Sequence, residues 1–366
     1  MTSPAPLPPS GNGEAPLLRV LGLKTWFRTP RGVVHAVDDV SFRLKRGDTL
    51  GIVGESGSGK SMLARTIMGL VPRNAITQGD IHFDGRELRS LSNEELRKIW
   101  GCEISMVFQD PTTALNPVMR VGTQITESLE LHTGLDRRDA RARAVELLGQ
   151  VGIPEPERRM RNHPHELSGG MRQRVWIAIA IACSPKLLFA DEPTTALDVT
   201  IQRQVLDLLT SLQRQNDMAM VLITHDLGVL ARRASHIMVM YGGQVVEAGV
   251  TEALFRETRH PYTASLLAST PRLEHSSHTR LAAIPGRPVD VIDPQPGCRF
   301  APRCRHAQPR CLVEDPELVA APKPGHRFRC FYPVGTPEGD EALEENLTKG
   351  KTAAGVGVRA QTEVRT

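Results

Sequence analysis

The chain has 366 residues, with 45 lysines and arginines against 41 aspartates and glutamates, a net charge of +4. Its 40% hydrophobic and 23% charged residues indicate a globular protein, long enough for a main domain with an appendage. The balanced charge argues against a nucleic-acid partner. The longest apolar run, from Val175 to Cys183, is far shorter than the roughly 20 residues of a membrane-spanning helix.

Composition divides the chain into four segments. Residues 1–16 are rich in Pro, Gly and Ala and lack the apolar stretch of a signal peptide, so we expect them to be disordered. Residues 17–250 alternate short β-type runs with helical patterns. Residues 251–335 contain one helix candidate, Tyr262–Ser269, and then a Pro-rich stretch with four cysteines. Residues 336–366, rich in Gly, Lys, Glu and Thr, are predicted to be a disordered tail.

The alternation within residues 17–250 predicts an α/β fold with a mostly parallel sheet. An Asp84-Gly85 turn predicts a hairpin near the front of this unit. Residues 121–152 have helical patterns only and predict a helical insertion, within a helical region of about 97–165. The expected strands are Val33–Phe42, Thr49–Val53, Ile104–Phe108, Lys186–Ala190, Met220–Thr224 and Ile237–Met240.

A phosphate-binding loop follows the strand that ends at Val53. The pattern G-x-x-x-x-G-K-[ST] is matched by Gly54, Glu55, Ser56, Gly57, Ser58, Gly59, Lys60 and Ser61. Glycines let backbone N–H groups surround phosphate oxygens, and the N-terminus of the following helix adds partial positive charge. We expect Lys60 to reach the terminal phosphates of ATP and the Ser61 hydroxyl to bind Mg²⁺.

Two carboxylates, Asp191 and Glu192, follow the apolar strand that ends at Ala190. Ligands of open parallel sheets bind beyond the carboxyl ends of the strands. Asp191 is therefore expected to hold Mg²⁺, directly or through water, and Glu192 to polarise the water that attacks the γ-phosphate.

A third motif lies 23 residues before Asp191, at Leu167-Ser168-Gly169-Gly170-Met171, and opens a helix. These motifs in this order resemble the ATP-binding cassette (ABC) ATPase family over about residues 18–335. The resemblance implies an ABC-type P-loop fold: a mostly parallel core sheet, an antiparallel β subdomain, a helical subdomain and a small Cys-bearing C-terminal extension.

The resemblance also implies roles for single residues. Gln109 matches the glutamine that senses Mg²⁺ and the attacking water, and His225 matches the switch histidine at the γ-phosphate. Ser168, Gly169 and Gly170 would contact the nucleotide of a partner subunit, which the loop Ala196-Leu197-Asp198 would face. Phe27, with Trp26 as its rival, resembles the aromatic residue that stacks on adenine.

Finer features resemble the oligopeptide and dipeptide importers, in particular their D-type ATPase. They are Val107–Pro111 with Ala114–Pro117, His260–Leu267, Met171, and Gly297–Cys304. The resemblance implies an ATPase on the cytoplasmic face of the inner membrane, peripherally attached. Its expected partners are a second ATPase in head-to-tail apposition, two permease subunits that dock near 109–152, and indirectly a peptide-binding protein. An importer of nickel or another small solute, and a soluble non-transport ABC protein, are alternatives.

Four cysteines, Cys298, Cys304, Cys311 and Cys330, lie in the segment with few apolar residues. Disulfides are disfavoured in a reducing compartment, and this segment has too few apolar residues to form a large core. A metal ion bound by the thiols is therefore expected to hold the segment together. The four thiolates suit an iron–sulfur cluster or zinc, and unligated or disulfide thiols also remain open. The family resemblance favours a [4Fe–4S] cluster of structural or regulatory role.

Overall fold

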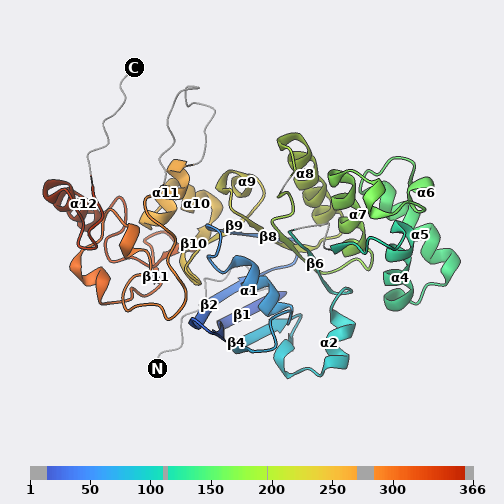
Figure 1. The fold of residues 1–366 in the computed structure, drawn as a ribbon, viewed down its shortest axis with the longest axis horizontal. Helices are drawn as coiled ribbons and strands as arrows, with labels where there is room; N and C mark the ends of the chain where they lie inside the picture. Colours follow the sequence, from blue (N-terminus) through green and yellow to red (C-terminus); the bar gives the residue numbers. More distant parts are fainter. Residues whose placement is uncertain (1–14, 110–113, 196, 270–283, 359–366) are drawn as a thin grey trace, which may run out of the picture.

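The computed structural model describes residues 15–109, 114–195, 197–269 and 284–358. The predicted disordered segment 1–16 thus lies almost wholly outside the described residues, as does the end of the predicted tail. The described residues form two β-sheets with helices around them (Figure 1). The predicted α/β fold, with a mostly parallel sheet, an antiparallel subdomain and a helical region, is confirmed.

An eight-stranded sheet forms the centre of the molecule. Five of its strands run parallel and are neighbours in the order β9, β3, β8, β7 and β6. The other three, β10, β12 and β11, extend the sheet beyond β9 in antiparallel pairs. The carboxyl ends of the five parallel strands therefore lie at one edge. In chain order the strands are β3 (Thr49–Val53), β6 (Ile104–Val107), β7 (Leu187–Asp191), β8 (Ala219–Thr224), β9 (His236–Tyr241), β10 (Gln244–Val250), β11 (Val319–Ala320) and β12 (Arg327–Phe328).

A four-stranded antiparallel sheet packs beside the central one, in the order β2-β1-β4-β5. Its strands are β1 (Leu18–Thr29), β2 (Gly32–Leu44), β4 (Ala75–Phe83) and β5 (Arg86–Glu87). The predicted Asp84-Gly85 hairpin is present: both residues have positive φ, 48° and 78°, as a two-residue hairpin turn requires. Apolar side chains of β1, β2 and β4 share one buried cluster with β3 and helix α1 (Lys60–Ile67).

The remaining helices cover the central sheet and extend from it. Helices α4 to α6 lie at one end of the molecule and the C-terminal region at the other (Figure 1). The predicted helical region 97–165 also contains β6, because the apolar run Ile104–Val107 pairs with β7. No helix among the described residues is long and apolar enough to cross a membrane. The helices are α2 (Asn93–Ile99), α4 (Val121–Thr133), α5 (Arg137–Gln150), α6 (Pro156–Arg159), α7 (Gly169–Ile181), α8 (Val199–Gln215), α9 (Leu227–Ala231), α10 (Thr251–Arg256), α11 (Pro261–Ser269) and α12 (Pro337–Lys349).

Helix α12 lies where composition predicts a disordered tail. The Thr336 hydroxyl accepts a hydrogen bond from the Gly339 N–H at 3.2 Å, and Gly350 ends the helix with φ of 67°. The buried Asn346 amide donates to the carbonyls of Arg305 and Ala307. Composition therefore misled here, because the start and stop signals and the polar docking contacts stabilise a helix in a hydrophilic segment.

Candidate functional site

The phosphate loop connects β3 to α1 at the carboxyl edge of the parallel strands, and its glycines allow a close approach of backbones. A side chain at Gly59 would place its Cβ 2.3 Å from the Ala36 carbonyl oxygen, and one at Gly54 would lie 2.2 Å from the Met240 carbonyl oxygen. Gly59 also has a φ of 100°, which favours glycine. The loop conformation therefore depends on glycine at both places.

Lys60 lies across this loop, buried at its base. Its Nζ donates to the carbonyl oxygens of Gly54 at 2.8 Å and Glu55 at 2.9 Å. Burial lowers the pKa of Lys60. Three carboxylates oppose that shift, in decreasing order those of Glu192, Asp191 and Glu55. The ammonium group is thus poised among carbonyls and carboxylates, at the place where an anion would compete for it.

Ser61 and Asp191 meet beside the loop. The Ser61 hydroxyl donates to the Asp191 Oδ1 at 2.8 Å, although the two residues are 130 positions apart. Asp191 is almost fully buried, and burial raises the pKa of its carboxyl, whereas the Ser61 bond acts in the opposite direction. Hydroxyl and carboxylate oxygens are ligands that Mg²⁺ prefers, so this pair fits a magnesium ion.

Glu192 lies one residue beyond β7, with a φ of 43° that is rare for a residue other than glycine. Its N–H donates to the Ile223 carbonyl at 2.9 Å. Its Oε2 accepts hydrogen bonds from Gln109 Nε2 at 3.1 Å and Thr195 Oγ1 at 2.9 Å, and lies 3.7 Å from His225 Nδ1. Gln109, Glu192 and His225, predicted separately from the ends of three strands, therefore form one cluster.

Sequence reasoning missed Thr195, which fixes the Glu192 carboxylate. A threonine three residues after the acidic pair carries no distinctive signal by itself.

Sequence reasoning also missed the apolar wall of the site. A cavity of about 520 Å³ lies between the phosphate loop, Gln109, Glu192 and His225, and Val34, Ala36 and Val291 line its other side. Val291 comes from the C-terminal region, where no motif marked it.

The sheet register distinguishes the two aromatic candidates. Phe27 pairs with Val34 and Trp26 pairs with His35 across β1 and β2. Directly paired residues of antiparallel strands point to the same face. Because Val34 lines the cavity, Phe27 lies on the cavity side of this sheet, and Trp26 lies on the other. Neither ring lines the cavity itself.

Ser168, Gly169 and Gly170 lie away from this cavity, at the start of α7. The Ser168 hydroxyl accepts a hydrogen bond from the Met171 N–H at 3.3 Å and caps the helix. Asp198 caps α8 in the same way, and Ala196 lies outside the described residues. The chain therefore holds the phosphate loop and the Ser-Gly-Gly segment at separate places.

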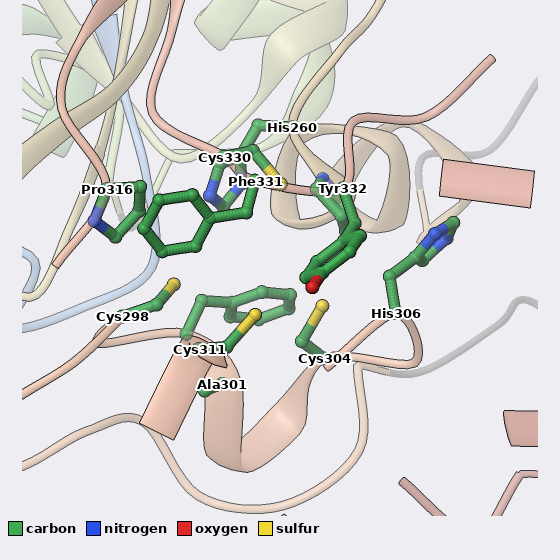
Figure 2. Close-up of a pocket in the computed structure, with 12 residues that line it drawn as sticks. His260, Cys298, Ala301, Cys304, His306, Cys311, Pro316, Cys330, Phe331 and Tyr332 are labelled. Carbon is green, nitrogen blue, oxygen red and sulfur yellow. The ribbon is translucent and has the colours of Figure 1, made fainter. Parts of the chain in front are cut away.

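The four clustered cysteines do line one enclosed cavity, together with His260, His306 and Tyr332 (Figure 2). The cavity measures about 10 Å³, which is room for about one water molecule. Across the part of the chain that the structure describes, no group of three or more His, Cys, Asp or Glu side chains is arranged to hold a metal ion. The prediction of a [4Fe–4S] cluster on Cys298, Cys304, Cys311 and Cys330 is therefore wrong.

The four thiols lie in largely apolar surroundings. Burial raises the pKa of the Cys298 thiol to about 11 and those of Cys304, Cys311 and Cys330 above their ordinary value. Burial thus favours the neutral thiol form of these side chains. Cys304 and Cys311 belong, with Phe300 and Ala301, to the same buried apolar cluster as strands of the main unit, and Cys298 packs against it.

Comparison with known proteins covers both parts of the chain. Residues 37–195 match the ABC transporter family, and residues 246–311 match the oligopeptide/dipeptide transporter C-terminal region. The oligopeptide transport ATP-binding protein OppD of Haemophilus influenzae is 50% identical over 298 residues, 81% of this chain and 92% of that protein. The dipeptide transport ATP-binding protein DppD of Escherichia coli is 48% identical over 319 residues, 87% of this chain and 97% of that protein.

A solved structure shares the fold of the main unit. It is the dimeric post-hydrolysis state of the ATP-binding cassette MJ0796 bound to ADP and Pi, which is 30% identical with a TM-score of 0.57. The match covers 64% of this chain and 98% of that one.

Proposed function

Because this chain belongs to the ATP-binding subunits of oligopeptide and dipeptide ABC transporters, we propose that its phosphate-loop cavity binds ATP with Mg²⁺ and hydrolyses ATP to power peptide import. The observation that carries the proposal is the meeting of Ser61 with Asp191, and of Gln109 with Glu192, around the phosphate loop. The chain is an ATPase of peptide transport.

The phosphate loop binds the triphosphate. The backbone N–H groups of Gly57, Ser58 and Gly59 and the N-terminus of α1 present partial positive charge to the phosphates. Lys60 Nζ exchanges its bonds to loop carbonyls for bonds to phosphate oxygens, which are stronger because both partners are charged. Val34, Ala36 and Val291 exclude water on one side. We infer that Phe27, which lies opposite Val34 on the cavity side of the antiparallel sheet, stacks on the adenine.

Ser61 and Asp191 hold the magnesium ion, and Gln109 completes the set. When bound, the ion neutralises charge that develops on the β- and γ-phosphates. The chain contributes the position of the two oxygens, because the Ser61 hydroxyl and the Asp191 carboxylate lie within hydrogen-bond distance of each other. Burial of Asp191 then favours pairing of its carboxylate with a cation.

Glu192 orients and polarises the attacking water. The Thr195 hydroxyl and the Gln109 amide both donate to one oxygen, Oε2, and so fix the direction of the carboxylate. His225 lies beside the same oxygen with an exposed side chain, free to reach the γ-phosphate. Glu192 therefore acts as the general base, and Gln109 and His225 sense the phosphate.

A complete site needs two subunits. The related MJ0796 cassette is dimeric, and in this chain the Ser168-Gly169-Gly170 segment lies away from the phosphate-loop cavity. We infer that this segment faces the nucleotide of a second ATPase in a head-to-tail dimer, where the N-terminus of α7 points at the γ-phosphate.

The same transporter supplies the remaining partners. Two permease subunits form the path for the peptide, and a peptide-binding protein delivers it from the other side of the membrane. Val118 and Leu131, 80% and 72% exposed, place apolar side chains on the segment before α4 and on α4 itself. This surface is the proposed docking site for the permease, with the chain on the cytoplasmic face. Residues 110–113 of the predicted docking segment lie outside the described residues.

Reconstitution tests the proposal. The chain is combined in proteoliposomes with its partner ATPase, its permease subunits and its peptide-binding protein, and uptake of labelled di-, tri- and longer peptides is measured with and without ATP. We expect ATP-dependent uptake of peptides and none of nickel. Uptake that proceeds equally without this chain, or with nickel as the preferred substrate, contradicts it.

A further inference from the structure

The C-terminal region reaches into the phosphate loop through Arg303. The guanidinium of Arg303 binds the Glu55 carboxylate at both oxygens, with 2.5 Å from Nη1 to Oε2 and 3.0 Å from Nη2 to Oε1. These residues are 248 positions apart, and the Arg303 side chain is only 4% exposed. Its Nε also donates to the Pro285 carbonyl at 2.7 Å. The Arg303 guanidinium therefore binds the C-terminal region through Pro285 and the phosphate loop through Glu55.

Tyr262 holds the backbone of the same residue. Its buried hydroxyl accepts a hydrogen bond from the Glu55 N–H at 2.8 Å. The Glu55 carbonyl oxygen in turn accepts from Lys60 Nζ. Side chain, N–H and carbonyl of Glu55 thus all have partners, and the first two come from residues beyond the main unit. Such contacts fix where the Glu55 side chain points.

The direction of the Glu55 carboxylate matters because Lys60 is close by. The negative charge of the Glu55 carboxylate raises the pKa of Lys60, against the effect of burial. A carboxylate released from Arg303 is able to turn toward Lys60 and compete with phosphate oxygens for it. It also adds negative charge beside an anionic ligand.

We propose that Arg303 is a positioning residue of the nucleotide site, which sequesters the Glu55 carboxylate so that Lys60 remains available to the phosphates of ATP. This inference rests on the proposed function and deepens it. The C-terminal region then sets the affinity of the phosphate loop for nucleotide, although none of the four cysteines touches that loop.

A double-variant cycle on the full-length chain tests the proposal. AMPPNP with Mg²⁺ is titrated calorimetrically into the wild type, Arg303→Gln, Glu55→Gln and the double variant. We expect Arg303→Gln to weaken binding about tenfold. In the Glu55→Gln background the same change should alter affinity by less than about twofold, because no carboxylate remains to compete.

Arg299 supplies the matched control. It is another buried arginine of the C-terminal region that binds a carboxylate of the main unit, Asp38 on β2, and it makes no bond to the phosphate loop. Arg299→Gln should therefore leave AMPPNP affinity unchanged. An equal loss of affinity in Arg299→Gln, or in the double variant relative to Glu55→Gln, shows a general undocking of the region and overturns the proposal.

Arg303→Lys covers the case in which Arg303→Gln does not fold. The lysine keeps a positive charge beside Glu55 but loses the bidentate geometry, so we expect a loss of affinity smaller than the roughly tenfold loss of Arg303→Gln. A loss as large as tenfold in a folded Arg303→Lys protein overturns the proposal. Normal wild-type binding with an unaffected Arg303→Gln variant overturns only this inference, whereas a wild type that does not bind AMPPNP overturns the proposed function as well.

Discussion

The nucleotide edge of the central sheet and the C-terminal region are held in place by different forces. At the nucleotide edge, β3, β7 and β8 are buried along their whole length, and the functional side chains follow their ends. Between residues 284 and 335, by contrast, the only strands the structure describes are two residues long. Apolar side chains such as Phe300 and Ala307 pack against the main unit, and buried ion pairs add to this attachment, as in Arg299 with Asp38 and Arg303 with Glu55.

This difference explains the error about the metal. A Cys-bearing segment with so few apolar residues would need a metal or a similar cross-link if it folded by itself. In the structure the segment folds against a large, preformed partner. The fully buried Glu247 of β10 accepts hydrogen bonds from the N–H groups of Arg259 and His260 and from His326 Nε2. Polar contacts of this kind order a segment that has little apolar surface of its own.

We expect the largest effect at the nucleotide edge, from a substitution of Glu192. Glu192→Gln keeps the shape of the side chain but removes the base, so hydrolysis in the assembled transporter should fall by about 10²–10⁴-fold while AMPPNP binding persists. Phosphate release measures the first effect and calorimetry the second. Near wild-type turnover would falsify the assignment of Glu192.

Lys60→Ala should weaken binding and hydrolysis together. The ammonium is the charged group that exchanges loop carbonyls for phosphate oxygens, so we expect at least about a tenfold loss of AMPPNP affinity. Thermal unfolding without nucleotide serves as the control, and the melting temperature should change little. A Lys60→Ala variant with unaltered affinity contradicts the role of Lys60.

In the C-terminal region the largest effect should come from the pair of His326 and Glu247. Both side chains are 0% exposed, so His326→Ala leaves a buried carboxylate short of a partner and should cost about 3 kcal/mol of unfolding free energy. Urea unfolding measures the loss. Arg31→Gln is the matched control, because the pair of Arg31 with Asp290 joins the same two regions but is largely exposed. Equal losses in both variants refute the contrast between buried and exposed pairs.

We expect the smallest effect in the main unit, from the partly exposed ion pairs of Lys186 with Asp84 and Glu103. Hydrogen bonding from Lys186 lowers the pKa of Asp84, and bonds from Arg86 and Lys186 outweigh burial to lower the pKa of Glu103. Carboxylates with lowered pKa values stabilise the fold above their unfolded pKa values, near pH 4, and lose this contribution as the pH falls further.

Lys186→Met should therefore cost less than about 1 kcal/mol at pH 7, because the pairs are partly exposed. The difference from the wild type should shrink as the pH falls below about 4 and vanish once both carboxyls are protonated in the folded protein. Melting temperatures across this pH range measure it. A difference that persists at low pH assigns the loss to packing of the lysine chain.

Much of the site could be predicted from the sequence, because its residues follow strands. The phosphate loop, Asp191, Glu192, Gln109 and His225 each come directly after an apolar run, and parallel strands bring such positions to one edge. Their meeting around Glu192 follows from that topology.

The rest depends on contacts that no local pattern encodes. Thr195 fixes Glu192 through one hydroxyl, and Val291 joins the cavity wall because its carbonyl accepts a bond from His35 of β2. The bond between Arg303 and Glu55 spans most of the chain. Helix α12 differs, because Thr336 and Gly350 are local signals that bound it although the composition of the segment is typical of a disordered tail.

The short strands β11 and β12 also have a consequence for the behaviour of the protein in solution. Without β12, strand β10 would be the edge of the sheet and would expose unpaired backbone N–H and C=O groups. Such edges can pair with strands of other molecules and lead to aggregation. Strand β12 pairs with Glu247 and Ala248 in the middle of β10, and β11 ends the sheet after two residues. The C-terminal region thus also covers this edge of the sheet, and we expect a chain cut after Val250 to precipitate where the full chain stays dissolved.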